Sequence, residues 1–186
     1  MVYLKETLLK DFKLNEMVSN ELIRDFKKRI PEQLLAIWEK DGFGSILSGY
    51  LKIVNPLDYQ ELLKETYVRS DDALVLFTTS MGDLIVWEDN RYLLMLNYRK
   101  GKMKGISSRF NYFLQDLVDD DLIFTEILDW LPYPKAVQKY GEPAYDECFG
   151  YVPLLGLGGP ERVENLQKVK LKEHILLISE LMGPIE

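Results

Sequence analysis

A chain of 186 residues is long enough to bury one substantial core, or to form two small lobes packed on each other. With 47% apolar and 28% charged residues it has the composition of a soluble globular protein, which excludes disorder as the default. A net charge of −7 opposes binding to nucleic acid and anionic lipid, a single cysteine excludes an internal disulfide, and no apolar run approaches the ~20 residues that cross a bilayer.

The N-terminal part of the chain predicts two consecutive helices. Apolar residues recur at steps of four within residues 18–30, among charged residues, which is the stripe of a half-buried helix. Pro31 suits the first position of a second helix, whose apolar face lies within residues 34–38. Gly42 can take the left-handed conformation that ends its last turn.

The middle of the chain predicts strands. Residues 50–54 have the pattern of one strand, and Asn55-Pro56 then turns the chain into a helix through Leu62 and Leu63. Further extended runs occupy residues 73–78, 83–87, 92–97 and 102–106. Short polar or glycine-containing loops of hairpin length separate these runs, so we expect an antiparallel meander.

Beyond residue 108 the strand pattern fades. Helices are predicted at residues 110–117, at 122–140 with Pro132 and Pro134 as interruptions, and at 171–182. We therefore predict an α+β fold in which N-terminal helices and an antiparallel β-meander pack against a mainly helical C-terminal lobe. The predicted units are an α+β domain at 1–108 and an acidic, mainly helical domain at 109–186.

Negative charge is concentrated in the second unit. Residues 116–147 hold nine carboxylates against two lysines, a local charge of −7 that equals the charge of the whole chain. Such a surface repels phosphate backbones and attracts basic macromolecules, so we expect a basic protein as partner and neither nucleic acid nor membrane. Ten of the 22 aromatic residues lie in the same stretch or close to it, where they could form an interface or build the core of the lobe.

Catalytic equipment is sparse. One histidine and one cysteine cannot assemble a thiolate and imidazole zinc site of three or four ligands. His174 has the setting of a residue that covers the core, and Cys148 that of a small buried hydrophobe, so we expect no enzyme. Residues 156–160 lack the third glycine of a dinucleotide loop, and we predict no cofactor.

Two charged clusters have ordinary structural explanations. Asp119, Asp120 and Asp121 could coordinate magnesium or calcium, but acidic residues at the start of a helix cap its free amides and offset its dipole, so no metal is predicted. The one basic cluster comprises Arg99, Lys100, Lys102, Lys104 and Arg109. A solvated loop between strands is its expected setting.

Several segments resemble a known family. Residues 30–38, 42–44 and 49–56 resemble the GAD-like N-terminal domain of bacterial immunity proteins. A second set of segments resembles the C-terminal domain of the same family, namely residues 149–153, 157–159, 163–169, 172–174 and 183–185. The order and spacing of these segments bracket nearly the whole chain.

The resemblance implies an immunity protein that binds and neutralises a DNase effector of type VI secretion or a related contact-dependent system in the cytoplasm of the producing cell and its kin. The absence of a secretory start in residues 1–6 agrees with a cytosolic place of action. Because a GAD domain also occurs in tRNA-linked amidotransferases and aspartyl-tRNA synthetases, the alternative is a translation-associated accessory binding module. That alternative predicts RNA affinity.

The acidic stretch supplies the candidate contacts. Carboxylates would pair with lysines and arginines of a basic nuclease domain, and tyrosines would fill shallow pockets. We predict as partner-binding residues Asp119, Asp120, Asp121, Glu126, Asp129, Tyr133, Tyr145, Asp146 and Glu147.

Overall fold

A seven-stranded antiparallel sheet organises the molecule. The structure, a computed structural model, describes residues 7–120 and 122–186. The strands are β1 (Lys13–Glu16), β2 (Phe43–Ile46), β3 (Leu51–Ile53), β4 (Ala73–Thr79), β5 (Leu84–Glu88), β6 (Tyr92–Asn97) and β7 (Lys102–Ser107). Each strand pairs with its neighbours in the chain, so the sheet order is β1 to β7. The predicted α+β class and its meander are confirmed, and the sheet gains β1 and β2 at one edge.

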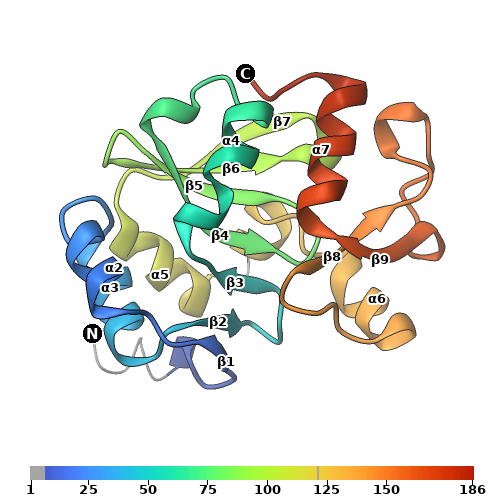
Figure 1. Cartoon of the computed structure of the whole chain (residues 1–186). Helices are drawn as coiled ribbons and strands as arrows, with labels where there is room; N and C mark the ends of the chain where they lie inside the picture. Colours follow the sequence, from blue (N-terminus) through green and yellow to red (C-terminus); the bar gives the residue numbers. More distant parts are fainter. Residues whose placement is uncertain (1–6, 121) are drawn as a thin grey trace.

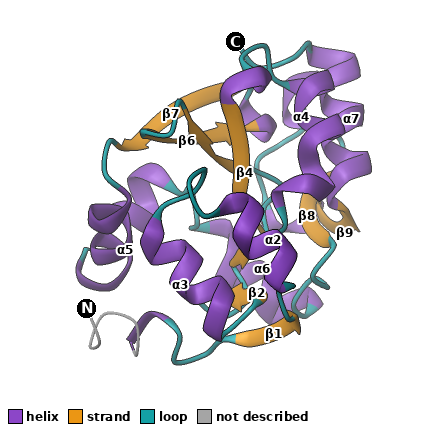
Figure 2. Cartoon of the chain, turned by 60° about the vertical axis from the view of Figure 1, so that its left-hand side comes forward, coloured by secondary structure: helices purple, strands orange, loops and turns teal. Residues whose placement is uncertain are grey.

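Helices cover both faces of this sheet (Figures 1 and 2). They are α2 (Asn20–Phe26), α3 (Glu32–Lys40), α4 (Gln60–Thr66), α5 (Phe110–Asp119), α6 (Pro132–Tyr140) and α7 (Leu171–Met182). In both views α4 and α7 lie together on one side, whereas α2, α3 and α5 lie on the other. Among the described residues, no helix is long and apolar enough to cross a membrane.

Two apolar cores follow from this arrangement. In β5, Ile85 and Trp87 belong to the core that includes residues of α3 and α5, whereas Leu84 and Val86 belong to the core under α4 and α7. Successive side chains of a strand point to opposite faces, so a sheet covered on both sides buries every one of them. This explains why β5 is a continuous apolar run instead of an alternating one.

The C-terminal lobe is mixed, which corrects the expectation of a mainly helical lobe. Strands β8 (Glu147–Tyr151) and β9 (Leu166–Lys170) form a separate antiparallel pair. The amide of Phe149 also donates to the carbonyl of Ser80 at 2.8 Å, which attaches β8 to the turn between β4 and β5. This contact between distant segments selects the extended conformation, and local sequence preference does not reveal it.

The predicted helix at 122–140 is divided. A π-helical turn (Ile123–Ile127) is followed by an irregular segment, and α6 begins at Pro132. Asp129 has φ 50°, a left-handed conformation that no helix continues through. Proline at the first position of α6 matches the interruption that the sequence predicts.

Candidate functional site

The end of α5 presents an acidic surface. Asp119 and Asp120 are exposed at the last turn, and Glu126 is exposed on the π-helical turn that follows. Asp116 lies partly exposed one turn before Asp120. None of these four carboxylates has an ion-pair partner within residues 7–120 and 122–186. Asp121 lies outside the described residues.

Exposed apolar side chains accompany these carboxylates. Tyr112 is 48% exposed and lies on the same face of α5 as Asp116 and Asp119, at helical spacings of four and three. Leu122 is 59% exposed and is separated by four residues from Glu126. We call Tyr112, Asp116, Asp119, Asp120, Leu122 and Glu126 the α5 surface. It combines unpaired charge with accessible apolar anchors, as protein interfaces do.

Two hydrogen bonds limit what the α5 surface can do. Asp120 Oδ1 accepts a hydrogen bond from the amide of Leu122 at 2.9 Å. This is the capping role that the sequence favours over a metal site for these acidic residues. The ammonium group of Lys104 donates to the carbonyl of Glu126, and the Arg109 guanidinium lies over the Tyr112 ring at 5.7 Å, so two basic side chains border the surface. Among the described residues, no cluster of three His, Cys, Asp or Glu side chains is placed to hold a metal ion.

Asp129 takes part in an ion-pair network that joins the two lobes. Its Oδ2 lies 2.7 Å from Lys100 Nζ and 3.5 Å from Arg99 Nη2. Arg99 in turn binds Asp83 through Nη2 at 2.6 Å and Nε at 3.3 Å, with both side chains buried. Although burial alone would raise the pKa of Asp129, Arg99 and Lys100 together hold it below its usual value. Lys100 extends the network to Glu161 at 2.9 Å.

The basic cluster is therefore only partly a solvated loop, which corrects the prediction made for it. Arg99 is 5% exposed and sits on the short 3-10 helix after β6, where it neutralises the buried Asp83. The sequence cannot show that a basic residue in a turn faces inward. Its partner lies 16 residues earlier in the chain, beyond the reach of any local pattern.

Two of the predicted contact tyrosines hold the fold together. Tyr133 is 2% exposed, and its hydroxyl donates to the carbonyl of Ser48 at 2.8 Å while its ring packs edge-on against Tyr50. Tyr145 is half-buried and donates to the carbonyl of Ile53 at 2.5 Å. Both rings therefore attach the C-terminal lobe to the sheet, and in this conformation Tyr133 offers no ring to a partner.

Asp146 and Glu147 are placed apart from the α5 surface. They lie at the start of β8, and both views show β8 and α5 on different sides of the molecule (Figures 1 and 2). Lys170 pairs with Asp146 at 2.7 Å and with Glu147 at 3.3 Å. The hydrogen bond from Lys170 lowers the pKa of Asp146. The nine predicted residues thus do not form one continuous surface.

A buried lysine anchors the segment before β8. Lys52 is 1% exposed, and its ammonium group donates to the carbonyl of Ala144 at 2.7 Å and to the carbonyl of Glu147. Burial lowers the pKa of Lys52 to about 8. The sheet thereby holds the loop between α6 and β8 through a charged donor. The apolar pattern of residues 50–54 does not reveal this contact.

His174 and Cys148 are neighbours without the features of a catalytic pair. Both approach Gly82: a Cβ placed there would lie 3.2 Å from Cys148 Sγ and 3.8 Å from His174 Cδ2. Burial raises the pKa of the Cys148 thiol to about 12 and lowers that of His174. A protonated, fully buried thiol beside a neutral imidazole is a poor nucleophile.

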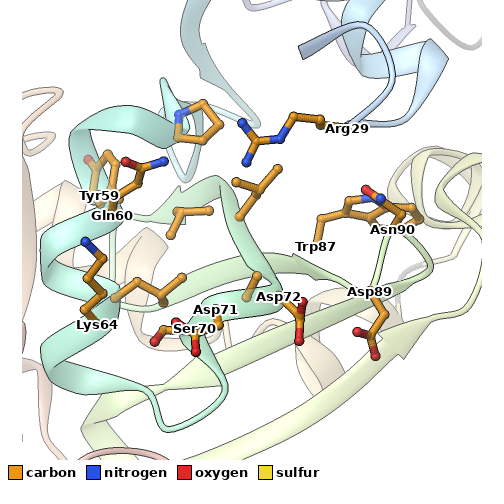
Figure 3. A pocket seen from close by; sticks show the side chains of 15 residues that line it. Arg29, Tyr59, Gln60, Lys64, Ser70, Asp71, Asp72, Trp87, Asp89 and Asn90 are labelled. Carbon is orange, nitrogen blue, oxygen red and sulfur yellow. The ribbon is translucent and has the colours of Figure 1, made fainter. Parts of the chain in front are cut away.

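A cavity of about 340 Å³ opens between α4, the start of β4 and the turn after β5. Figure 3 shows the side chains that surround it, with Arg29 on one side and Asp71, Asp72 and Asp89 on the other. Lys64 lines it as well but is paired with Glu61 at 2.7 Å. We call this the α4 cavity. Acidic side chains outnumber basic ones along it, and it lies away from every predicted contact residue.

Comparison with known proteins places the chain among immunity proteins. Residues 4–99 match the family model described as GAD-like domain, and residues 107–182 match that described as T6SS immunity protein Tdi1, C-terminal. The crystal structure of Atu4351 from Agrobacterium tumefaciens superposes with a TM-score of 0.72 at 18% identity. The superposition covers 95% of this chain and 88% of the Atu4351 chain. At 18% identity this likeness shows the fold alone. No curated protein matches the sequence.

Proposed function

Because the chain belongs to the family of type VI secretion immunity proteins that join a GAD-like domain to a Tdi1 C-terminal domain, we propose that it binds a secreted DNase toxin and neutralises it by association alone. The match of residues 107–182 to an immunity-protein domain carries the proposal. No bond is made or broken by the protein itself. The proposed place of action is the cytoplasm of the producing cell.

We propose the α5 surface as the main contact with the toxin. It lies inside the immunity-protein match and carries four carboxylates without ion-pair partners among the described residues. A nuclease cleft attracts phosphate, so a carboxylate cluster can compete for the same basic side chains and speed the encounter. Leu122 and Tyr112 would supply the apolar anchors that a charged rim lacks.

The predicted contact residues have different roles in this proposal. Asp119, Asp120 and Glu126 are its core, and Asp121 stays a proposed contact on the sequence alone. Asp146 and Glu147 already neutralise Lys170, so a toxin would gain less by pairing with them. Asp129, Tyr133 and Tyr145 are proposed to act indirectly, because they hold the lobe that carries the surface.

An inhibition titration tests the proposed function. The toxin encoded beside this gene is purified, and plasmid cleavage is measured while this protein is added up to and beyond an equal molar amount. We expect cleavage to stop near one protein per toxin. Unchanged cleavage by an active nuclease in the presence of excess protein would refute the proposal. Binding to tRNA with no effect on any neighbouring toxin would favour the translation-associated alternative.

A further inference from the structure

An apolar groove lies beside the α5 surface and is lined by both family-matched regions. Residues 7–11 and the turn after β2 contribute one part of its lining, and the end of α5 and the segment 124–130 contribute the rest. Its apolar lining residues are Leu8, Leu47, Leu117, Val118, Phe124 and Trp130. Its volume of about 280 Å³ lies just below the ~300–1,000 Å³ of sites for small molecules, so a single side chain suits it better. We call it the Trp130 groove.

The turn after β2 is held in place at the groove. Leu47 and Ser48 have φ of 55° and 54°, a left-handed conformation that is uncommon for residues with side chains. The carboxylate of Asp11 accepts hydrogen bonds from the amides of Leu47 and Ser48, at 3.2 and 2.5 Å. The hydroxyl of Tyr133 donates to the carbonyl of Ser48 at 2.8 Å. This part of the lining is therefore fixed before any partner arrives, which lowers the entropy cost of binding.

Two aromatic rings also line the groove. The ring centroids of Phe124 and Trp130 lie 5.5 Å apart, and the amide of Trp130 donates to the carbonyl of Phe124 at 2.9 Å. Both residues are partly exposed, as is Val118. The Nε1 of Trp130 is buried, so this residue offers ring surface and no donor. Apolar surface that stays in contact with water gains free energy when a partner covers it.

Unpaired carboxylates border the groove. Val118 directly precedes Asp119 and Asp120, which have no ion-pair partner within residues 7–120 and 122–186. Lys10 and Asp11 line the groove as well and offset each other in charge. The potential is therefore negative on the α5 side of the groove, where a partner should carry lysine or arginine.

We propose that the Trp130 groove receives one large apolar side chain of the toxin, such as leucine, methionine or phenylalanine, with lysine or arginine beside it on the toxin surface. This inference rests on the proposed toxin binding and adds which kind of toxin segment is recognised. The carboxylates of the α5 surface speed the encounter. The groove holds the complex once it has formed, because the apolar contact is made only after docking.

Dissociation kinetics with the purified toxin test the groove separately from the charges. Val118→Trp fills the groove, and Val68→Trp makes the same change at an exposed position just after α4, which lies on the other side of the sheet. We expect Val118→Trp to raise Kd at least about tenfold through faster dissociation, while the association rate and its salt dependence stay close to those of the parent protein. Val68→Trp should leave both rates unchanged.

Thiol protection gives a second measurement that needs no bulky substitution. Val118→Cys places a thiol in the groove, Val68→Cys is its control, and the native Cys148 is fully buried. Mass spectrometry of this chain follows the reaction with a maleimide. Both introduced thiols should react in the free protein, and excess toxin should slow the reaction of Val118→Cys at least about tenfold while Val68→Cys stays reactive.

Two results would overturn the proposal and leave the proposed function standing. One is a dissociation rate of Val118→Trp equal to that of the parent protein, and the other is an unprotected Val118→Cys thiol in a complex that still inhibits the toxin. If the parent protein does not bind the toxin, the proposed function fails and the groove assignment with it. Protection of Val118→Cys in the free protein that ends when residues 1–6 are removed would show that the chain's own N-terminal segment fills the groove, and this too would overturn the proposal.

Discussion

Removal of the Arg99 guanidinium should destabilise the protein severely. The side chains of Arg99 and Asp83 are 1% and 0% exposed, and two hydrogen bonds join them. Arg99→Met leaves Asp83 with only the hydroxyl of Thr79, 3.2 Å away, as a side-chain donor. Breaking a buried ion pair from one side costs about 3–5 kcal/mol, a large part of the roughly 5–15 kcal/mol that a domain has.

A double-mutant cycle measures this effect, with the stability of each variant determined by urea unfolding. With a urea dependence of about 2 kcal/mol per molar, a loss of about 4 kcal/mol lowers the midpoint by about 2 M. Asp83→Asn should also destabilise the protein, since it leaves the buried guanidinium of Arg99 without the carboxylate of Asp83. The double variant should lose less than the sum of the two, by at least about 2 kcal/mol. Lys64→Gln, which disrupts an exposed pair, should leave the midpoint unchanged.

Additivity of Asp83→Asn and Arg99→Met within about 0.5 kcal/mol would show that the two side chains do not stabilise each other. So would a cost for Arg99→Met below about 1 kcal/mol. Either result would mean that water or a neighbouring group compensates the buried charge.

Three further predictions concern single side chains. The pKa of Lys52 is about 8 in the folded protein and 10.5 in the free side chain, so the unfolded chain holds the proton to higher pH. Between pH 8 and 10.5 the free energy of unfolding should therefore rise by up to about 3 kcal/mol relative to that of Lys52→Met. Urea unfolding measures this difference, and a difference that stays constant with pH contradicts the prediction. Burial lowers the pKa of His174, so the unfolded chain binds its proton first and the melting temperature should fall below pH 6.5; His174→Gln should flatten that slope, and an unaltered slope removes His174 as its cause. Cys148, with a pKa raised by burial to about 12, should react with a thiol reagent in urea but hardly in buffer, and equal rates would show that the site is open.

The strands of the meander could be predicted because their ends are marked locally. Glycine and asparagine loops separate β4 to β7, and β4 and β5 are rich in β-branched and aromatic residues. Strand β2 is not predictable in this way, because it has only four residues and includes Gly44. A Cβ at Gly44 would come within 2.3 Å of the carbonyl of Lys13, so this glycine is needed for close contact with β1.

The candidate site shows a different limit. The composition of residues 116–147 revealed the acidic stretch, but it could not separate paired from unpaired carboxylates. Asp146 is neutralised by Lys170 and Asp129 by Lys100, both through contacts between segments distant in sequence. The aromatic residues pose the same problem, since Tyr112 is exposed and Tyr133 is core although both lie in acidic surroundings. Only tertiary structure decides such cases.

Association kinetics test whether the unpaired carboxylates of the α5 surface recruit the toxin. Stopped-flow rates with the purified toxin are compared for the parent, for a variant with Asp119→Asn, Asp120→Asn and Glu126→Gln, and for a control with Asp146→Asn and Glu147→Gln. We expect the first variant to associate at least about tenfold more slowly at low salt and to lose much of its salt dependence, while the control stays close to the parent. Equal rates for the first variant and the parent, or a larger loss in the control, would contradict this expectation.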